Sequence, residues 1–378
     1  MEIYLDNSAT TRVSPEVAQT VCNMMTEEFG NPSSLHRKGF LAERAVADAR
    51  QTMASILGVQ PAEVVFTSSG SESNSLAVVG AALSARHSGK KIVTTAIEHS
   101  SVMACGKHLE SLGYQVTYVA PRSDGSVDPQ AIAHAVDNQT TLVSVMHVNS
   151  ETGAINDLEA IAWAVKDKNP KALVHSDCVQ SFCKLPVTPK SWNVDMISAC
   201  AHKIHGPKGV ALLYAAKGVR LTPLTFGSAQ EKGLHPGTEN VPGICGFAEA
   251  AAQMWRSRKE NTALFRQLSG HLKENICQLE GVCINSPQNG APYIVNLSAQ
   301  GIRSEVFIHY LEQFGIYVSS GSACSKGAKS HVLSAMELSP KAIDSALRVS
   351  LCRYNTIEEI DEFCARLRQG MQEIARSN

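Results

Sequence analysis

Short apolar segments, many rich in β-branched residues, recur between residues 64 and 215 and alternate with stretches long enough to hold a helix. This rhythm is typical of a largely parallel sheet with helices on both faces. Residues 205–209, which join the last two segments, are too few for a crossover helix, so we expect that pair to be antiparallel. The pattern predicts a mixed, mostly parallel seven-stranded sheet with strands at residues 64–67, 91–95, 116–120, 142–148, 172–176, 195–200 and 210–214.

The C-terminal part of the chain follows a different pattern. Helical periodicity covers residues 247–279 and predicts one long helix that runs from one domain into the next. A capping box at Thr356 and Glu359 opens a last helix. The short apolar segments between these helices lie at residues 282–284, 293–297, 316–319 and 347–351. Because 378 residues exceed one usual hydrophobic core, we expect a large domain of residues 15–250 and a small α+β domain of residues 1–14 and 251–378.

Net charge, apolar runs and cysteine spacing limit the kinds of partner, cellular location and metal site that the sequence supports. A formal net charge of −1 gives no electrostatic footprint for nucleic acid or an anionic membrane. The N-terminus lacks a basic region followed by an apolar stretch, and no apolar run reaches the roughly 18 residues of a membrane span, so we expect a cytoplasmic protein. The 11 cysteines include no CxxC pair and no metal-ligand spacing, so we expect no metal site.

Polar residues follow the predicted strands at the points where the strands end. They include Gly70 with Ser71, Glu98 with His99, Ser150, Asp177 with Gln180, and His202 with Lys203. Ligands of open α/β sheets gather beyond the carboxyl ends of the strands. The sequence therefore predicts that these side chains converge on one edge of the sheet.

Lys203 and Asp177 suggest a particular chemistry. A lysine can form a Schiff base with the aldehyde of pyridoxal phosphate (PLP), and an aspartate can keep the pyridine nitrogen protonated so that the ring acts as an electron sink. The two residues are 26 positions apart, which is enough for one helix and one strand and lets both lie at neighbouring strand ends. This pairing favours a PLP site over the alternatives of a helix cap and a surface lysine.

Four further residues are open to two interpretations each. Gly70 and Ser71 open a helix whose first N–H groups can bind phosphate, although serine turns are also common helix caps. His99 can stack on a planar cofactor and move protons, or be a hydrogen-bonded structural histidine. Arg348 sits in an apolar strand, where its guanidinium can hold a substrate carboxylate or form an internal salt bridge.

Cys324 lies in a small, polar, glycine-containing segment without apolar periodicity, unlike a structural cysteine. Lys326, Lys329 and His331 nearby can lower the pKa of its thiol and so enrich the reactive thiolate. The sequence thus predicts a mobile, reactive thiol.

Ordered motifs along nearly the whole chain resemble one family. The motifs are Tyr4 to Thr11, Phe29 to Ser34, Glu98-His99, His147 to Gly153, His202-Lys203, Pro236 to Asn240 and Ser320 to Cys324. Together they resemble the cysteine desulfurases of the nitrogenase and iron–sulfur-cluster type, which are class-V aminotransferase-like members of the fold-type I PLP enzymes. The resemblance implies a PLP-dependent sulfurtransferase that acts as a homodimer and converts L-cysteine to L-alanine.

The resemblance also implies a role for each matching residue. Lys203 would bind PLP, and Cys324 would take sulfur from the cysteine–PLP adduct as a persulfide and pass it to an acceptor protein for iron–sulfur cluster or other thio-cofactor synthesis. The sequence does not identify that acceptor. The other implied contacts are Asp177 to the ring nitrogen, Gln180 to the phenolic oxygen, His99 on the ring, Arg348 to the substrate carboxylate, and Gly70, Ser71, Cys200, His202 and the partner's Thr238 to the phosphate, with Ser150 beside the cofactor.

The chain departs from the family pattern at several of these positions. Ser150 stands where an asparagine is usual, Cys200 where a phosphate-binding serine is usual, and His235 where an arginine is common. Two alternatives follow. One is a selenocysteine lyase or other PLP-dependent C–S lyase, which would not need Cys324. The other, from another class, is a degenerate binding protein without turnover.

Overall fold

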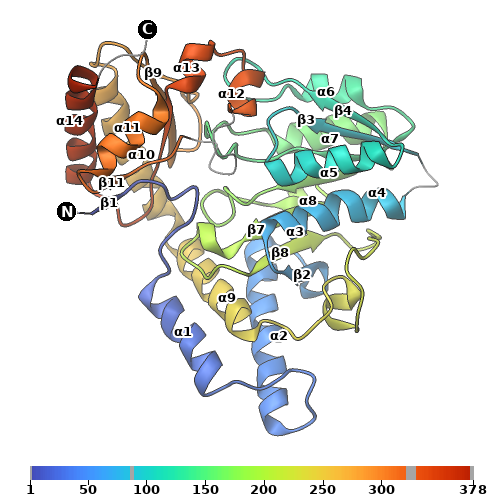
Figure 1. The fold of residues 1–378 in the computed structure, drawn as a ribbon. Coiled ribbons are helices and arrows are strands. Elements are labelled where there is room, and N and C mark those ends of the chain that lie inside the picture. The colour runs from blue at the N-terminus through green and yellow to red at the C-terminus, as the bar shows by residue number, and fades with distance from the viewer. Residues whose placement is uncertain (1, 86–88, 321–328, 375–378) are drawn as a thin grey trace.

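The computed structural model describes residues 2–85, 89–320 and 329–374. The chain forms two lobes, and its first and last described residues lie in the same lobe (Figure 1). In the larger lobe, seven strands of the described residues form one sheet, here the large sheet, in the order β2-β8-β7-β6-β5-β3-β4. These strands are β2 (Val64–Thr67), β3 (Lys91–Thr95), β4 (Gln115–Val119), β5 (Thr140–Ser144), β6 (Leu173–Asp177), β7 (Met196–Cys200) and β8 (Ala211–Ala215).

The predicted sheet is confirmed in its composition and its direction. Strands β3 to β7 pair in parallel, and β8 pairs antiparallel with both β7 and β2. One segment was too long in the sequence-based prediction, because β5 ends at Ser144 instead of residue 148. Residues 145–148 are buried as a loop beyond the strand, and periodicity cannot distinguish a buried apolar loop from a strand.

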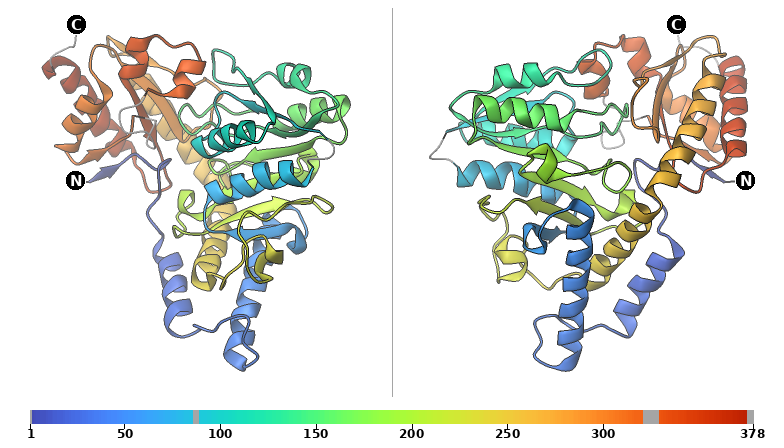
Figure 2. Two further views of the ribbon diagram at one scale, coloured as in Figure 1. Left: turned by 45° about the vertical axis from the view of Figure 1, so that its right-hand side comes forward. Right: turned by 180° about the vertical axis from the view of Figure 1, so that it is seen from behind.

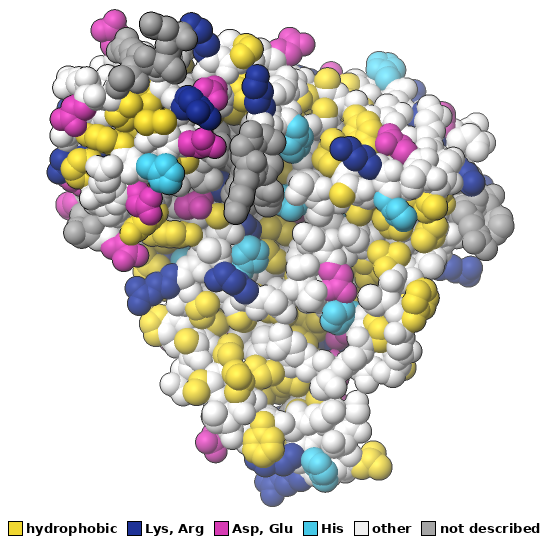
Figure 3. All heavy atoms as spheres, viewed as in Figure 1, with side chains coloured by type: hydrophobic (Ala, Val, Ile, Leu, Met, Phe, Trp, Pro, Cys, Tyr) yellow, Lys and Arg dark blue, Asp and Glu magenta, His cyan; other side chains and the backbone are white. Residues whose placement is uncertain are grey.

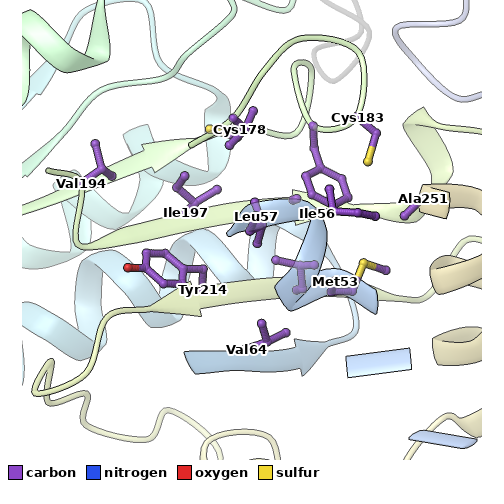
Figure 4. Close-up of a cluster of buried hydrophobic side chains, with 14 of the residues drawn as sticks. Met53, Ile56, Leu57, Val64, Cys178, Cys183, Val194, Ile197, Tyr214 and Ala251 are labelled. Carbon is purple, nitrogen blue, oxygen red and sulfur yellow. The ribbon is translucent and has the colours of Figure 1, made fainter. Parts of the chain in front are cut away.

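Side chains of the large sheet alternate between two buried faces, as both-sided burial requires. Val93, Val143 and Ile197 point into one apolar cluster, while their neighbours Ile92 and Leu142 point into another. Figure 4 shows the first cluster where Met53, Ile56 and Leu57 of α2 pack against the sheet. The helices of this face are α1 (Pro15–Thr26), α2 (Arg37–Leu57), α6 (Pro129–Ala135), α7 (Leu158–Lys168), α8 (Pro189–Trp192) and α9 (Val241–Arg256).

The opposite face of the large sheet is covered by helices that begin close to the strand ends. Helix α3 (Gly70–Ser75), the π-helical segment η2 (Leu76–Gly80) and α4 (Ala81–Ser84) follow one another along the chain, and α5 (Ser100–Ser111) packs beside them. Short 3₁₀ turns connect other elements. They are η1 (Pro61–Glu63), η3 (Ala201–Lys203) and η4 (Gln230–Gly233).

The smaller lobe has its own apolar cluster, which joins the start of the chain to its end. Ile3 and Leu5 are buried there with Phe265, Phe307 and Phe363. Strand β1 (Ile3–Tyr4) pairs in parallel with β11 (Ile316–Tyr317), and β12 (Ala346–Ser350), β10 (Ile294–Ala299) and β9 (Val282–Ile284) form an antiparallel sheet. The helices are α10 (Arg258–Ile276), α11 (Ser304–Glu312), α13 (Pro340–Asp344) and α14 (Ile357–Glu373).

The predicted domain boundaries at residues 14/15 and 250/251 stay a prediction. Val332 and Leu333 of α12 (His331–Ala335) belong to the apolar cluster of the large sheet, although they follow β11 of the small lobe in the chain. The small lobe therefore sends one short helix back to the large one. That helix helps to close the space between the lobes.

The prediction of a single helix over residues 247–279 was wrong. The chain forms α9 and α10, which meet at Ser257 and run in succession along the back of the molecule (Figure 2). Ser257 leaves the helical conformation at φ −94° and ψ 15°, and its hydroxyl donates to the Gln253 carbonyl. Apolar spacing continues across this break, so periodicity alone does not reveal it.

Candidate active site

A cavity of about 470 Å³ lies beyond the carboxyl ends of the central strands of the large sheet. The small lobe contributes Arg348 to its wall, and the N-terminal segment contributes Ser8 and Ala9. The sequence-predicted site residues that line this cavity are Gly70, Ser71, His99, Ser150, Asp177, Gln180, Cys200, His202, Lys203 and Arg348. The predicted convergence at the sheet edge is therefore what the structure shows.

Asp177 is the last residue of β6 and is held in a fixed orientation. Asn74 Nδ2 donates to Asp177 Oδ2 over 2.7 Å, and the Val179 N–H donates to Oδ1 over 2.9 Å. The side chain is almost fully buried. A carboxylate held in this way presents a stable negative charge to any group in the cavity.

His99 caps α5 and belongs to the same network. The backbone N–H of Ser101 donates to His99 Nδ1, so the proton of the neutral ring is on Nε2. Asn74 Nδ2 also donates to Ser101 Oγ, which lies 2.8 Å from His99 Nδ1. Asn74 thus links Asp177 to His99, a connection that no sequence motif revealed.

Lys203 ends the turn η3, which directly follows β7. Its Nζ donates to the carbonyls of Ser8 and Ala9 at 2.5 and 2.6 Å. Gln180 Nε2 donates to the same Ser8 carbonyl over 3.0 Å. The N-terminal segment therefore holds the lysine and the glutamine of the cavity in position.

The opposite corner of the cavity carries donors suited to an anion. Ser69 caps α3, and Gly70 and Ser71 form its first turn. A Cβ on Gly70 would lie 2.8 Å from Val179 Cγ2, so only glycine allows these two segments to approach so closely. Burial raises the pKa of Cys200 to about 11, so its thiol keeps its proton at neutral pH. Burial and Lys203 lower the pKa of His202 to about 3.

Arg348 lies in β12 and is almost fully buried. Its Nη2 donates to Asp6 Oδ1 over 2.8 Å, and its Nη1 donates to the Ser150 carbonyl over 2.9 Å. The internal salt bridge that the sequence left open is present in this structure. The guanidinium still lines the cavity, so an entering carboxylate would compete with Asp6.

Sequence reasoning missed two acidic residues at this site. Glu98 is fully buried in the cavity wall, and burial raises its pKa to about 8. Burial also raises the pKa of Glu151, which accepts a hydrogen bond from Ser330 Oγ. Glu98 stood beside His99 in a quoted motif, but only the structure shows that its side chain is enclosed.

Two predicted residues are not among the described residues that line the cavity. Thr238 is exposed between η4 and α9, so its predicted contact through a second subunit stays a prediction. Cys324 lies outside the described residues. His235, one of the departures from the family pattern, pairs with Glu72 of α3, with Nδ1 and Oε1 2.7 Å apart.

The described residues on both sides of 321–328 are attached to the cavity wall. Ser319 forms a bridge with Arg348, where the Arg348 N–H donates to the Ser319 carbonyl over 2.6 Å. On the other side, Ser330 binds Glu151, and His331 Nε2 lies 2.9 Å from the Glu98 carbonyl. Ser319 and Ser330, which stand on either side of Cys324 in the sequence, are therefore both attached to the cavity wall.

The residues present fit PLP. They offer an amine at Lys203, a fixed carboxylate at Asp177, and hydroxyl and N–H donors at the start of α3. Asn74 Oδ1 and Glu98 Oε2 are buried without a hydrogen bond to any described residue, as expected of a wall built around a polar ligand.

The chain belongs to the class-V aminotransferase family, whose family model matches residues 3–363. The resemblance drawn from the motifs is thereby confirmed. Among curated relatives, a protein of Nostoc sp. named "Cysteine desulfurase" is 39% identical over 367 residues, which cover 95% of this chain and 90% of the relative.

Solved structures agree with this placement. One described as "NIFS-LIKE PROTEIN" matches with a TM-score of 0.94 at 37% identity, over 99% of this chain and all of that chain. Another, "SspA in complex with cysteine", matches with a TM-score of 0.83 at 31% identity, over 94% of this chain and 100% of that chain. Across the described ranges, no helix is both long and apolar enough to span a bilayer.

Proposed function

We propose that this protein is a PLP-dependent cysteine desulfurase, which converts L-cysteine to L-alanine and transfers the sulfur to Cys324 as a persulfide. The observation that carries the proposal is the single cavity that unites Lys203, Asp177 and Arg348. A lysine nucleophile, a fixed anion and a carboxylate-binding cation are the three groups that amino-acid chemistry on PLP requires.

PLP, when bound, supplies an electron sink that labilises the bonds at Cα and Cβ of the substrate. Lys203 holds the cofactor and then moves the proton at Cα. Asp177, fixed by Asn74, keeps the ring nitrogen protonated. Gly70, Ser71, Cys200 and His202, which line the cavity, would hold the phosphate, and His99 would contact the ring.

Arg348 holds the carboxylate of the substrate in this proposal. Its guanidinium is enclosed, so its hydrogen bonds to a carboxylate are strong and selective. Asp6 occupies the guanidinium until the substrate arrives. The neighbouring structure described as a complex with cysteine supports L-cysteine as the amino acid.

Cys324 is the sulfur acceptor in this proposal. Its thiolate attacks the substrate Sγ, so that a new S–S bond forms as the Cβ–Sγ bond breaks. The bonding electrons stay with Cβ, which takes up a proton and yields alanine. The attachment of Ser319 and Ser330 to the cavity wall, on either side of Cys324 in the sequence, supports this role.

A homodimer is part of the proposal. Large apolar side chains are exposed at the end of the molecule that α1 and α2 form, where Figure 3 shows yellow side chains next to basic ones. They include Phe29, Leu35 and Phe40. A second subunit seated there would cover them and could bring its Thr238 to this cavity. The persulfide would pass to an acceptor protein in the cytoplasm for iron–sulfur cluster or other thio-cofactor synthesis.

The test is alanine formation from L-cysteine with a reductant, measured for PLP-loaded wild type and Cys324→Ala while the cofactor absorbance is recorded. Cys283→Ala is the matched control, because Cys283 is exposed on β9 of the small lobe. We expect alanine from wild type and from Cys283→Ala, and none from Cys324→Ala with its cofactor band intact. Equal alanine from all three proteins would favour a C–S lyase, and none from any would favour a binding protein without turnover.

A further inference from the structure

Thr11 is buried beside the turn that carries Lys203. It is only 4% exposed and is not among the described residues that line the cavity. Its hydroxyl donates to the His202 carbonyl over 2.9 Å and accepts from the His205 N–H over 2.7 Å. His202 and His205 stand on either side of Lys203 in the chain, so a single side chain holds the backbone before and after the lysine.

Backbone contacts join the same segment to this turn. The Thr11 N–H also donates to the His202 carbonyl over 2.8 Å, and the Ser14 N–H donates to the His205 carbonyl over 3.1 Å. The contacts of Thr11 and Ser14 therefore cover the turn from the residue before Lys203 to the second residue after it.

The turn needs such support because its conformation is strained. His205 has φ 65°, in the left-handed region that a side chain with a Cβ disfavours. A Cβ on Gly206 would lie 2.8 Å from Ala201 Cβ, so the chain also turns back closely on itself here. A strained backbone persists only where its surroundings hold it. The Thr11 hydroxyl is one of the contacts that hold this turn, two residues from Lys203.

The two ends of the lysine side chain have different tasks when the cofactor binds. Lys203 Nζ donates to the carbonyls of Ser8 and Ala9. Loading with PLP joins Nζ to the aldehyde carbon, and the aldehyde oxygen leaves as water. The nitrogen of that linkage carries at most one proton, so it cannot keep both hydrogen bonds. The amine must therefore move while the backbone of the lysine stays in place, and Thr11 holds that backbone.

We propose that Thr11 is a positioning residue, whose hydroxyl fixes the backbone of Lys203 so that the amine reaches the cofactor aldehyde and, during turnover, the proton at Cα of the substrate. The proposal rests on the proposed function, because it takes Lys203 as the cofactor-binding lysine. Thr11 acts through Lys203 and does not touch the ligand. A displacement of about 1 Å at a reacting atom can lower a rate about a hundredfold, so a small shift of this turn is enough to slow both steps.

The experiment compares wild type, Thr11→Val and Thr11→Ser. One measurement is the rate at which the full-length apoprotein, mixed with PLP, develops the cofactor absorbance, and the other is alanine formation from L-cysteine by the loaded protein. Valine keeps the shape of threonine but leaves the buried His205 N–H without its acceptor. The loading rate and kcat of Thr11→Val should each fall about tenfold, with KM within about twofold of wild type. Thr11→Ser, which keeps the hydroxyl, should hold both rates within about twofold of wild type.

Thr140→Val is the matched control for the loss of hydrogen bonds. Thr140 is 3% exposed and lies at the start of β5, the end of that strand away from the cavity. Its hydroxyl likewise accepts from a backbone N–H and donates to an oxygen, both of Asp137. Urea denaturation should show lower stability for both valine variants, whereas the loading rate and kcat should fall only in Thr11→Val.

Wild-type loading and kcat in Thr11→Val would overturn the inference and leave the desulfurase proposal standing. Equal losses in Thr140→Val, or a loss in Thr11→Ser as large as in Thr11→Val, would overturn it as well, because the hydroxyl beside Lys203 would then not be the cause. Thr11→Ala also lacks the hydroxyl and takes the place of Thr11→Val, with the same expected losses, if valine prevents folding. Failure of wild type to develop a cofactor band would instead overturn the proposed function and the inference together.

Discussion

The two ends of the cavity are built in different ways. At one end, Asp177 and His99 are held by Asn74, in contacts that a ligand does not need to break. At the other end, Arg348 is paired with Asp6, which a substrate carboxylate has to replace. In the proposed function, the first end would be organised in advance for a resident cofactor, while the second would exchange partners at every turnover. The contacts of Asp177 should therefore govern kcat, and those of Arg348 should govern the KM for the substrate.

Asp177→Asn should break the preorganised end and have the largest effect. Without the negative charge, the ring nitrogen loses its proton, and we expect kcat to fall by about 10²–10³-fold while KM changes little. The measurement is steady-state alanine formation by the loaded protein.

Asp195→Asn is the matched control for this change. Asp195 pairs with Lys166 and lies just before β7, at the end of that strand away from the cavity. Its kcat should stay within twofold of wild type. An equal loss in both variants would mean that Asp177 acts through stability instead of through charge in the cavity.

Asp6→Asn should strengthen substrate binding at the end of the cavity that contains Arg348. Loss of the competing carboxylate makes Arg348 easier to engage, so KM for L-cysteine should fall severalfold. The same change removes a charged hydrogen bond, so the free energy of unfolding should fall by about 1.5–3 kcal/mol. Kinetics and urea denaturation of one preparation measure both effects.

Arg348→Ala removes the other member of the same ion pair. It should raise KM by about ten- to a hundredfold, because the charged hydrogen bonds to the substrate carboxylate are lost. If KM rose in Asp6→Asn as well, Asp6 would be needed to orient Arg348 and would not be its competitor.

Glu98→Gln should have the smallest effect, confined to the pH dependence of stability. The pKa of Glu98 is raised from 4.5 to about 8, so the folded protein binds a proton that the unfolded chain releases. Its stabilising contribution is therefore present below pH 4.5 and is lost as the pH rises to about 8. Glutamine is neutral throughout and keeps the acceptor for the Met146 N–H, so its unfolding free energy should depend less on pH in this window. Parallel pH profiles of wild type and variant would contradict the buried, protonated state.

The sequence predicted the residues that stand at strand ends better than the contacts that orient them. Asp177 and Lys203 follow directly from the strand pattern, because parallel strands end at one edge of a sheet. Asn74 and Thr11 lie on a helix and a loop whose packing the sequence does not encode locally, so their contacts with Asp177 and His202 were not predicted. The pairing of Asp6 with Arg348 joins residues 342 positions apart, which no local pattern can reveal.

The N-terminal segment has a consequence for how the protein is made. Ser8 and Ala9 form part of the cavity wall, yet β1 is held by β11, and Asp6 by Arg348. During synthesis the first residues must wait until those of β12 have left the ribosome before they reach their final places. The site is therefore among the last parts of the molecule to be completed, because it cannot form before β12 has been translated.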